Sequence, residues 1–386
     1  MLRGADNLAT LSAFKALGIA VEDQGDTVVI HGGPLQAPEG DLDLGNSGTA
    51  MRLMAGVLAG QPFNCVLTGD ESLTSRPMGR IIKPLRQMGA VIDSADQGSA
   101  PLRIHGRALH GVQYQSPIAS AQVKSAVLFA GLRASGPVTV TEPHRSRDHS
   151  ERMLAAFGAD IRVDGLTVTL QPNPALQGQE VVVPGDISSA AFFIGYGLLA
   201  QTTVKILGVG MNPTRTGIID ILRRMGANID VRNSTEQAGE PVADLIVHPS
   251  PLHGVEISGD DVVRAIDEFP LVFCLAAQAQ GRTTICGAEE LRVKESDRIA
   301  VMATALRTLG VDIVERPDGA VIDGGNPLLA DQRVDAAGDH RCAMALSVLA
   351  AASQTPVLID GCHNVDTSYP QFVEHAESVG IEVSSL

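Results

Sequence analysis

The chain has 386 residues, of which 44% are hydrophobic, so it is long enough for two domains with buried cores. Its formal net charge is −15 and only 3% of its residues are aromatic, which excludes the basic, aromatic surface of a nucleic-acid-binding protein. Without a run of 18 apolar residues or a signal-peptide pattern, we expect a cytoplasmic monomer with no membrane span and no nucleic-acid partner.

Common cofactor and metal motifs are absent from the sequence. The five cysteines are scattered without a C-x-x-C pair, which predicts reduced thiols and no zinc knuckle. There is no H-E-x-x-H, no G-x-x-x-x-G-K-[ST] and no G-x-S-x-G, and residues 208–217 (GVGMNPTRTG) are a poor dinucleotide loop. We therefore expect no metal site and no cofactor.

A helical tail that runs into a glycine and then into an alternating strand recurs six times. The glycines lie roughly 70 residues apart, a spacing that chance does not explain. A glycine just past the end of a helix adopts the left-handed conformation that stops it, so each one predicts a helix end. In chain order they are Gly18, Gly89, Gly158, Gly226, Gly310 and Gly380.

Five apolar segments, each opened by a small polar cluster, precede the later glycines. They read as buried helices whose polar starts are N-caps. Their ranges are 46–60, 120–132, 186–200, 267–281 and 339–351. By the same spacing, a matching helix for the first repeat falls before Met1, so the chain is expected to begin inside its first repeat.

These repeats predict an α/β architecture of two lobes, residues 1–183 and 184–386, each built from three βαβ-type repeats. The first repeat is expected to be incomplete. Helix starts from both lobes are expected to converge on a cleft that binds anions, because helix N-termini attract phosphate.

Charged strings supply the candidate chemistry. Residues 291–298 (LRVKESDR) place Lys294 and Arg298 four apart, on one face of a predicted helix, although alone such a string is more typical of a solvated face. Residues 74–80 (TSRPMGR) suit a cationic loop and equally a surface turn. Three capped helix starts also carry titratable groups, which are Asp267 with Glu268, Asp339 with His340 and Arg341, and Lys124 one turn beyond Ser120. Residues 145–152 (RSRDHSER) offer Arg147, Asp148 and His149. The whole set suits acid–base chemistry between phosphorylated anions.

These strings together resemble the enolpyruvyl transferase family, and within it the branch that acts on shikimate 3-phosphate. The resemblance covers essentially the whole chain. It rests on eight strings in one order: 44–52 (LGNSGTAMR), 76–80 (RPMGR), 120–125 (SAQVKS), 147–154 (RDHSERML), 266–270 (IDEFP), 291–298 (LRVKESDR), 339–341 (DHR) and 367–372 (TSYPQF).

The resemblance implies a two-lobed fold, an inside-out α/β barrel. It also implies transfer of the carboxyvinyl group of phosphoenolpyruvate to the 5-hydroxyl of shikimate 3-phosphate, with release of phosphate and without a metal. The two small molecules would be its only partners.

Site roles follow from the same resemblance. Ser120, Ala121, Gln122 and Arg147 would hold shikimate 3-phosphate. Phosphoenolpyruvate would be held by Arg76, Arg298 and Arg341, with Asn46, Gly48 and Thr49 lining its site. Asp267 and Lys294 would serve the 5-hydroxyl, and Glu295 would exchange a proton with the methylene carbon.

Two departures from the family pattern stand out. The family opens with a strand and a PGDKS-type motif that this sequence lacks, so we expect residues 1–386 alone to show little or no transferase activity. Many members carry a lysine where this chain has Asp366, which is expected to affect affinity for phosphoenolpyruvate.

Two alternatives remain open at this point. One is the branch of the family that transfers the same group to UDP-N-acetylglucosamine, whose loop over phosphoenolpyruvate carries a cysteine. Here the nearest cysteine to residues 76–80 is Cys65, which ranks this branch second. The other is a noncatalytic remnant that at most binds anions, unless Met1 is an internal methionine of a longer reading frame.

Overall fold

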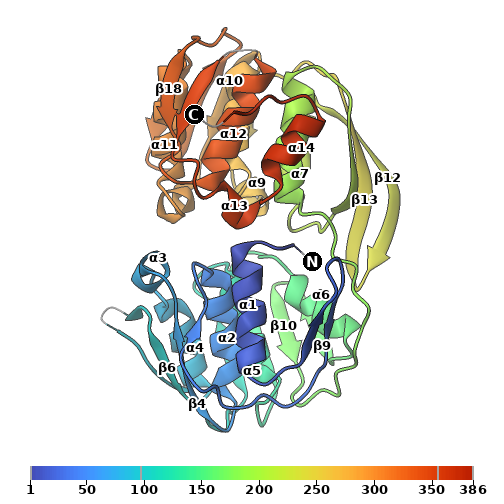
Figure 1. The fold of residues 1–386 in the computed structure, drawn as a ribbon, viewed down its shortest axis with the longest axis vertical. Helices are drawn as coiled ribbons and strands as arrows, with labels where there is room; N and C mark the ends of the chain where they lie inside the picture. The colour runs from blue at the N-terminus through green and yellow to red at the C-terminus, as the bar shows by residue number, and fades with distance from the viewer. Residues whose placement is uncertain (1, 96–97, 354–355, 385–386) are drawn as a thin grey trace. The chain divides into compact units, whose positions relative to one another are not determined.

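The computed structural model describes residues 2–95, 98–353 and 356–384. The chain divides into two compact units, one reaching Val182 and the other starting at Val183 (Figure 1). Each unit has its own buried cluster of apolar side chains.

A six-element repeat builds both units. Each complete copy has a strand, a buried helix and a second strand, followed by a helix and a two-stranded hairpin. The first unit holds two complete copies: β3 (Leu42–Asp43), α2 (Gly48–Ala59), β4 (Asn64–Thr68), α4 (Gly79–Gln87), β5 (Val91–Asp93) and β6 (Leu102–His105), then β7 (Val112–Gln115), α5 (Ala121–Gly131), β8 (Val138–Thr141), α6 (His149–Ala156), β9 (Ile161–Asp164) and β10 (Thr167–Leu170). The second unit holds one: β14 (Glu256–Ile257), α10 (Phe269–Gln278), β15 (Gly281–Ile285), α11 (Arg298–Thr308), β16 (Asp312–Arg316) and β17 (Gly319–Gly324).

The other copies are shorter in the part of the chain that the structure describes. The first copy consists of α1 (Ala5–Ala16), β1 (Val21–Asp23) and β2 (Val28–Ile30). The copies that flank the complete one in the second unit are α7 (Ile187–Leu199), β11 (Val204–Gly210), α8 (Gly217–Arg224), β12 (Asn228–Gln237) and β13 (Glu240–His248), and β18 (Gln332–Asp335), α12 (His340–Ala352), β19 (Val357–Asp360) and α14 (Phe372–Ser378). Short connecting helices are α3 (Glu71–Ser75), α9 (Asp260–Ala265), η2 (Glu289–Val293) and α13 (Val365–Ser368). The predicted α/β fold of six repeats with a short first copy is confirmed.

The sheets differ in one respect from the predicted βαβ plan. In the copy that starts at β3, the strands on either side of α2 are parallel, as a βαβ crossover requires. Strand β6 then pairs antiparallel with both β4 and β5. Each complete copy therefore forms a four-stranded mixed sheet, with strand orders β3-β4-β6-β5, β7-β8-β10-β9 and β14-β15-β17-β16.

The predicted glycine stops are confirmed in all six repeats. Each of the six glycines has φ between 84° and 103°. At the first, the N–H of Gly18 bonds to the carbonyl of Lys15, and the N–H of Ile19 bonds to that of Phe14. This pair of bonds is the Schellman motif, and the other five repeats form the same pair. A single local signal thus ends the outer helix of every repeat.

The five predicted central helices are present as α2, α5, α7, α10 and α12. Side chains such as Met51 and Met54 in α2 and Phe269 and Phe273 in α10 are at most 2% exposed, so these helices fill the interior of each unit. Helices α2 and α5 pack against one another, as do α7, α10 and α12. The N-terminal ends of α2, α5 and α12 carry some of the candidate site residues, among them Thr49, Gln122 and Arg341.

Candidate active site

The N-terminal end of α2 carries part of the candidate site in the first unit. Ser47 caps this helix by accepting an N–H of its first turn at 3.2 Å. Arg76, from the segment between α3 and α4, donates Nη2 to Oδ1 of Asn46 at 2.6 Å, and Asn46 donates Nδ2 to Asp70 at 2.7 Å. The structure therefore brings Asn46, Gly48 and Arg76 together.

Gly48 leaves room for two guanidinium groups beside the helix backbone. A Cβ at this position would lie 2.9 Å from Nη1 of Arg52 and 3.2 Å from Nη1 of Arg76. Burial lowers the pKa of Arg52, and the charges of Arg76 and Arg80 lower it further. These like charges and the helix N-terminus together favour a bound anion. Sequence reasoning missed Arg52, although its position one turn after Gly48 could have indicated it.

Helix α5 is linked to α2 through side chains. Gln122 accepts a hydrogen bond from Nη1 of Arg52 at 2.8 Å, and its Nε2 donates to Oγ1 of Thr49 at 2.8 Å. Ser120 caps α5, and Ala121 is the first residue of that helix. Thr49 and Gln122, which the sequence assigned to different substrates, are therefore in direct contact.

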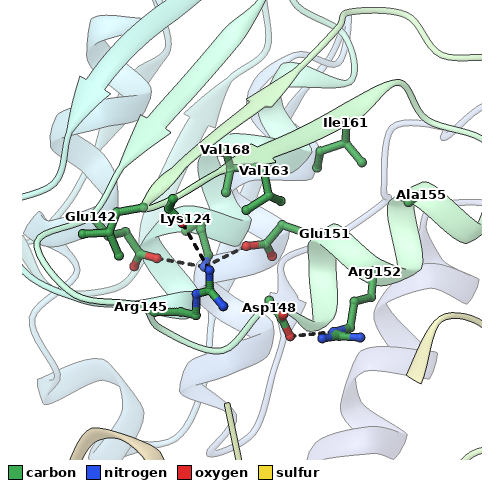
Figure 2. A pocket seen from close by; sticks show the side chains of 12 residues that line it. Lys124, Glu142, Arg145, Asp148, Glu151, Arg152, Ala155, Ile161, Val163 and Val168 are labelled. Carbon is green, nitrogen blue, oxygen red and sulfur yellow. Dashed lines mark hydrogen bonds and ion pairs between the residues drawn. The ribbon is translucent and has the colours of Figure 1, made fainter. Parts of the chain in front are cut away.

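Arg147 lies in the loop between β8 and α6 and is half-buried. Lys124, on α5, points into the unit, where its Nζ lies 2.8 Å from Glu142 and 2.7 Å from Glu151 (Figure 2). The side chains of all three residues are at most 4% exposed. A cavity of about 300 Å³ lies beside them, partly lined by Arg145. Burial raises the pKa of Glu151 despite the nearby lysine. The sequence pattern indicated Lys124 but did not predict its buried carboxylate partners, Glu142 and Glu151.

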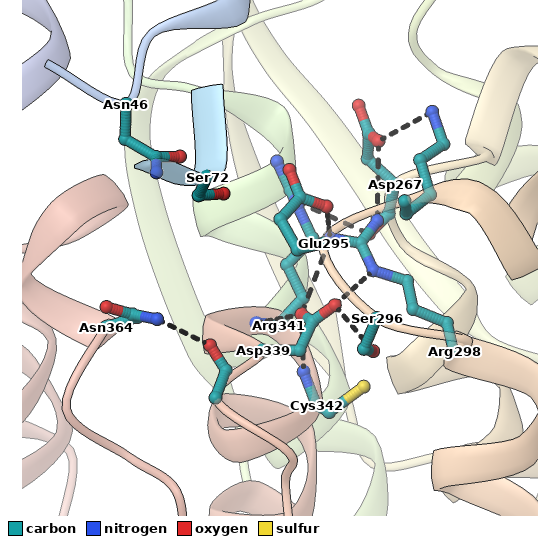
Figure 3. Close-up of polar contacts among 12 residues, drawn as sticks. Asn46, Ser72, Asp267, Glu295, Ser296, Arg298, Asp339, Arg341, Cys342 and Asn364 are labelled. Atoms are coloured by element: carbon teal, nitrogen blue, oxygen red, sulfur yellow. Dashed lines mark hydrogen bonds and ion pairs between the residues drawn. The ribbon is translucent and has the colours of Figure 1, made fainter. Parts of the chain in front are cut away.

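In the second unit, the predicted catalytic residues gather around one arginine (Figure 3). Oδ1 of Asp267 lies 3.9 Å from Nζ of Lys294 and 3.7 Å from Nη1 of Arg298. Nη2 of Arg298 lies 2.6 Å from Oε2 of Glu295. Two carboxylates expected to serve one reaction therefore share a single buried guanidinium, and the ammonium of Lys294 lies beside one of them.

Arg298 is held most firmly by Asp339. The Arg298 side chain is 1% exposed and that of Asp339 is fully buried, and Nε donates to Oδ2 at 2.8 Å. Asp339 also caps α12 by accepting the N–H of Arg341 at 3.0 Å. Burial opposes both charges, but each group shifts the pKa of the other toward the charged form, raising that of Arg298 and lowering that of Asp339. Nη1 of Arg298 forms no hydrogen bond with any described residue.

The predicted helix through residues 291–298 is wrong. Turn η2 ends at Val293, and α11 begins only at Arg298, because Oδ1 of Asp297 caps it by accepting the N–H of Ala300 at 3.0 Å. Lys294 therefore does not share a helical face with Arg298. The solvated-face alternative is wrong for Arg298, which is buried.

Asp267 and Glu268 do not cap α10 as predicted. No side chain caps this helix, and a proline in its first turn removes one N–H that would need a partner. Glu268 instead accepts a hydrogen bond from the hydroxyl of Ser188. Arg215 donates to Ser188 at 2.7 Å and to Asp186 at 2.8 Å. Burial, and then the charge of Asp267, raise the pKa of Glu268.

Arg341 and His340 adjoin this cluster. Arg341 donates Nη1 to the backbone carbonyl of Asp267 at 3.4 Å. Burial, followed by the charge of Arg341, lowers the pKa of His340 to about 4, so its imidazole is neutral at pH 7. Burial opposes ionisation of Glu295, yet Arg298 lowers the pKa of this carboxyl. Asp366 is exposed on α13.

Two features are absent from residues 2–95, 98–353 and 356–384: a metal-binding cluster and a membrane-spanning helix. No group of three or more His, Cys, Asp or Glu side chains in these ranges is arranged to hold a metal ion. None of the helices formed by these residues is long and apolar enough to cross a membrane.

The six repeats and the polar ends of the central helices indicate the class of protein to which the chain belongs. The enolpyruvyl transferase NikO from Streptomyces tendae has the same fold, with a TM-score of 0.77 at 20% identity, over 97% of this chain and 87% of that one. An EPSP synthase structure from Acinetobacter baumannii gives a TM-score of 0.91 at 46% identity, over 100% of this chain and 90% of that one. The fold is therefore that of the enolpyruvyl transferases.

Sequence comparison identifies the branch of the enolpyruvyl transferases to which the chain belongs. A family model described as EPSP synthase (3-phosphoshikimate 1-carboxyvinyltransferase) matches residues 1–376. Proteins named 3-phosphoshikimate 1-carboxyvinyltransferase from Alkalilimnicola ehrlichii and Acidithiobacillus ferrooxidans are 53% and 55% identical, over 99% and 100% of this chain and 87% and 90% of their own lengths. This chain belongs to the EPSP synthase family.

Proposed function

We propose that the protein transfers the carboxyvinyl group of phosphoenolpyruvate to the 5-hydroxyl of shikimate 3-phosphate and releases phosphate. Membership of the EPSP synthase family supports this reaction over transfer to UDP-N-acetylglucosamine. The observation that carries the proposal is the cluster around Arg298, where Asp267 and Glu295 both pair with one buried cation and Lys294 pairs with the same Asp267.

Binding is assigned to the helix ends. Shikimate 3-phosphate is held by Ser120, Ala121, Gln122 and Arg147. The hydroxyl of Ser120 caps α5 through an oxygen lone pair, so its proton is still able to donate a hydrogen bond to the substrate. Arg76, Arg298 and Arg341 hold phosphoenolpyruvate with Asn46, Gly48 and Thr49. Support comes from the contact of Arg76 with Asn46 and from the Nη1 atom of Arg298, a buried donor that an anionic oxygen would satisfy.

The chemistry needs one proton transfer to carbon, one from the same carbon and one from oxygen. The 5-hydroxyl oxygen attacks C2 of phosphoenolpyruvate as C3 gains a proton, which gives a tetrahedral intermediate. Loss of a proton from C3 and of phosphate from C2 then forms the enol ether. Asp267 accepts the hydroxyl proton, because the cations of Lys294 and Arg298 keep a nearby carboxylate ionised.

Glu295 exchanges the proton at C3. In the substrate-free chain, Arg298 lowers the pKa of this carboxyl, which favours the ionised, proton-accepting form. An anionic substrate beside Arg298 would compete for the same guanidinium and raise the pKa of Glu295, so that it can also act as the acid. One side chain can thereby serve both steps.

An acceptor comparison tests the function. Phosphate release is measured with phosphoenolpyruvate and either shikimate 3-phosphate or UDP-N-acetylglucosamine, and the product is identified by mass spectrometry. Membership of the EPSP synthase family favours release with shikimate 3-phosphate alone, in place of the little or no activity that the missing motif led us to expect. Release only with the UDP-sugar would replace the proposal with the alternative acceptor, and release with neither would identify a noncatalytic chain.

We further propose that the protein is a cytoplasmic monomer. The five cysteines all lack a disulfide partner, which suits a reducing compartment. Sedimentation equilibrium should give a mass near 40.3 kDa, and fractionation of cells should recover the protein with cytoplasmic markers.

A further inference from the structure

The carboxylate of Glu142 joins two segments that carry residues assigned to shikimate 3-phosphate. Its Oε1 accepts the backbone N–H of Ser120 at 3.0 Å, at the start of α5. Its Oε2 accepts the hydroxyl of Ser146 at 2.8 Å, in the loop just before Arg147. Nζ of Lys124 lies 2.8 Å from the same Oε2. The start of α5 and the loop before Arg147 are therefore fixed to one buried group, which Figure 2 shows beside Lys124.

Burial makes these bonds sensitive to small changes. Glu142 is 5% exposed and Ser146 is also 5% exposed, so water cannot replace a lost partner without rearrangement. An uncompensated donor in such a place is costly, and hydrogen bonds to a charged acceptor are the stronger ones. The distance between Ser120 and Arg147 is thereby held by Glu142.

We propose that Glu142 is a positioning residue for shikimate 3-phosphate, which sets Ser120 and Arg147 at the spacing that the substrate requires. The inference rests on the proposed function. Glu142 itself touches neither substrate in this proposal; it acts through the N–H of Ser120 and the hydroxyl of Ser146.

The Glu142→Gln variant breaks this arrangement with little change of shape. An amide has one oxygen and one NH₂ group, whereas the carboxylate accepts bonds from three donors. Because the Lys124 ammonium requires the oxygen, the NH₂ group would face the N–H of Ser120. We expect the KM and Kd for shikimate 3-phosphate to rise about tenfold, with kcat and the KM for phosphoenolpyruvate changed less than about threefold.

Ser146→Ala is the milder second variant. It removes one hydroxyl and leaves the bonds of Glu142 to Ser120 and Lys124 intact, so the fold should be retained. We expect the KM for shikimate 3-phosphate to rise about threefold. This variant decides the question if Glu142→Gln does not fold.

Glu151→Gln is the matched control. Glu151 pairs with the same lysine and is equally buried, but it bonds to neither Ser120 nor Ser146. Helix α6, which carries it, is also fastened to α5 by the Ser125 and Ser150 hydroxyls at 2.7 Å. We therefore expect a change in melting temperature with an unchanged KM for shikimate 3-phosphate.

The three variants and the wild type are compared by steady-state kinetics, titration calorimetry with shikimate 3-phosphate, and thermal melting. An active wild type whose KM and Kd for shikimate 3-phosphate stay within twofold in Glu142→Gln and Ser146→Ala would overturn the inference. An equal rise in Glu151→Gln would also overturn it, because the effect would then belong to the ion pairs. A wild type that neither binds nor turns over shikimate 3-phosphate would refute the proposed function, and this inference with it.

Discussion

Arg298 interacts with three carboxylates at once, those of Asp339, Glu295 and Asp267. The bond to Asp339 is fully buried, whereas Glu295 is 40% exposed. The first therefore orders the guanidinium, and the second leaves a carboxylate that a substrate can reach. Each gives a separate test.

Replacing Glu295 by Gln should remove its proton exchange and keep its shape. General acid–base groups contribute roughly 10² to 10⁴ in rate, so we expect kcat to fall by that factor while the KM for shikimate 3-phosphate changes little. Steady-state kinetics measure both. An unchanged kcat would remove Glu295 from the mechanism.

Replacing Asp339 by Asn should destabilise the second unit, because it leaves the buried guanidinium of Arg298 short of its best partner. Breaking a buried pair from one side costs about 3 to 5 kcal/mol in the free energy of unfolding, measured by urea titration. Asp360→Asn is the control. Its partner Arg333 is 69% exposed, and such surface pairs are worth about 1 kcal/mol or less. Equal losses in the two variants would contradict the assignment.

His340 should make the free energy of unfolding depend on pH. In the unfolded chain its imidazole takes up a proton near pH 6.5, but in the native chain only near pH 4. Between these values the unfolded chain binds more protons, so stability decreases as the pH falls from 6.5 toward 4. His340→Gln lacks this proton and should lose less stability between pH 7 and pH 5. Urea midpoints at both pH values measure the difference; an equal loss in both proteins would refute the prediction.

Among the elements, helices α2 and α5 pack closely at Gly56, where the absence of a side chain lets the two backbones approach one another. A Cβ on Gly56 would lie 2.1 Å from the backbone oxygen of Ala126, which cannot move aside as a side chain can. Alanine would otherwise favour a helix by roughly 0.5 to 1 kcal/mol over glycine. At this position, the overlap must outweigh that gain.

We therefore expect Gly56→Ala to lower the free energy of unfolding by about 1 to 3 kcal/mol. At Gly79, in α4, a Cβ would meet nothing within 4 Å, so Gly79→Ala should leave stability unchanged or raise it by about 0.4 to 1 kcal/mol. Urea unfolding of both variants gives the comparison. A Gly56→Ala protein as stable as the wild type would show that α2 and α5 can separate at little cost.

Elements with local signals could be predicted from the sequence. The glycine stops are set by bonds within six residues, and the caps of α2, α5, α7 and α12 by bonds within three. The start of α11 was misplaced although Asp297 is a local cap, because the spacing of Lys294 and Arg298 suggested a helix. Pairings such as Glu268 with Ser188, 80 residues apart, arise only when distant helix ends pack together. The regular spacing of the sequence repeats does not predict such long-range pairings.

The whole molecule is organised around separate cores. One large apolar cluster runs from Ile187 to Ile381, and those of the first unit lie between Ala13 and Leu170. The connecting residues 171–186 are mostly exposed and include Pro172, Pro174 and Pro184. We propose that the lobes 1–183 and 184–386 fold independently.

Expressed alone, residues 184–386 should show a cooperative urea transition by far-ultraviolet circular dichroism. The reason is that their central helices α7, α10 and α12 pack on one another. The same measurement on residues 1–183 is the companion experiment. A fragment without a transition would show that its core is incomplete by itself.

Nη1 of Arg298 is a buried donor without a hydrogen bond among the described residues, and the carboxylate nearest to it in an ion pair, that of Asp267, lies 3.7 Å away. Selection for stability alone would place a fixed acceptor within hydrogen-bond distance of Nη1, as Asp339 is for Nε of the same side chain. Leaving it open ties folding to ligand occupancy, since an anionic oxygen that bonds there also removes a defect of the native state. Selection for a more stable protein would therefore favour a permanent acceptor beside this nitrogen, whereas selection for a better catalyst would keep the nitrogen open to the substrate.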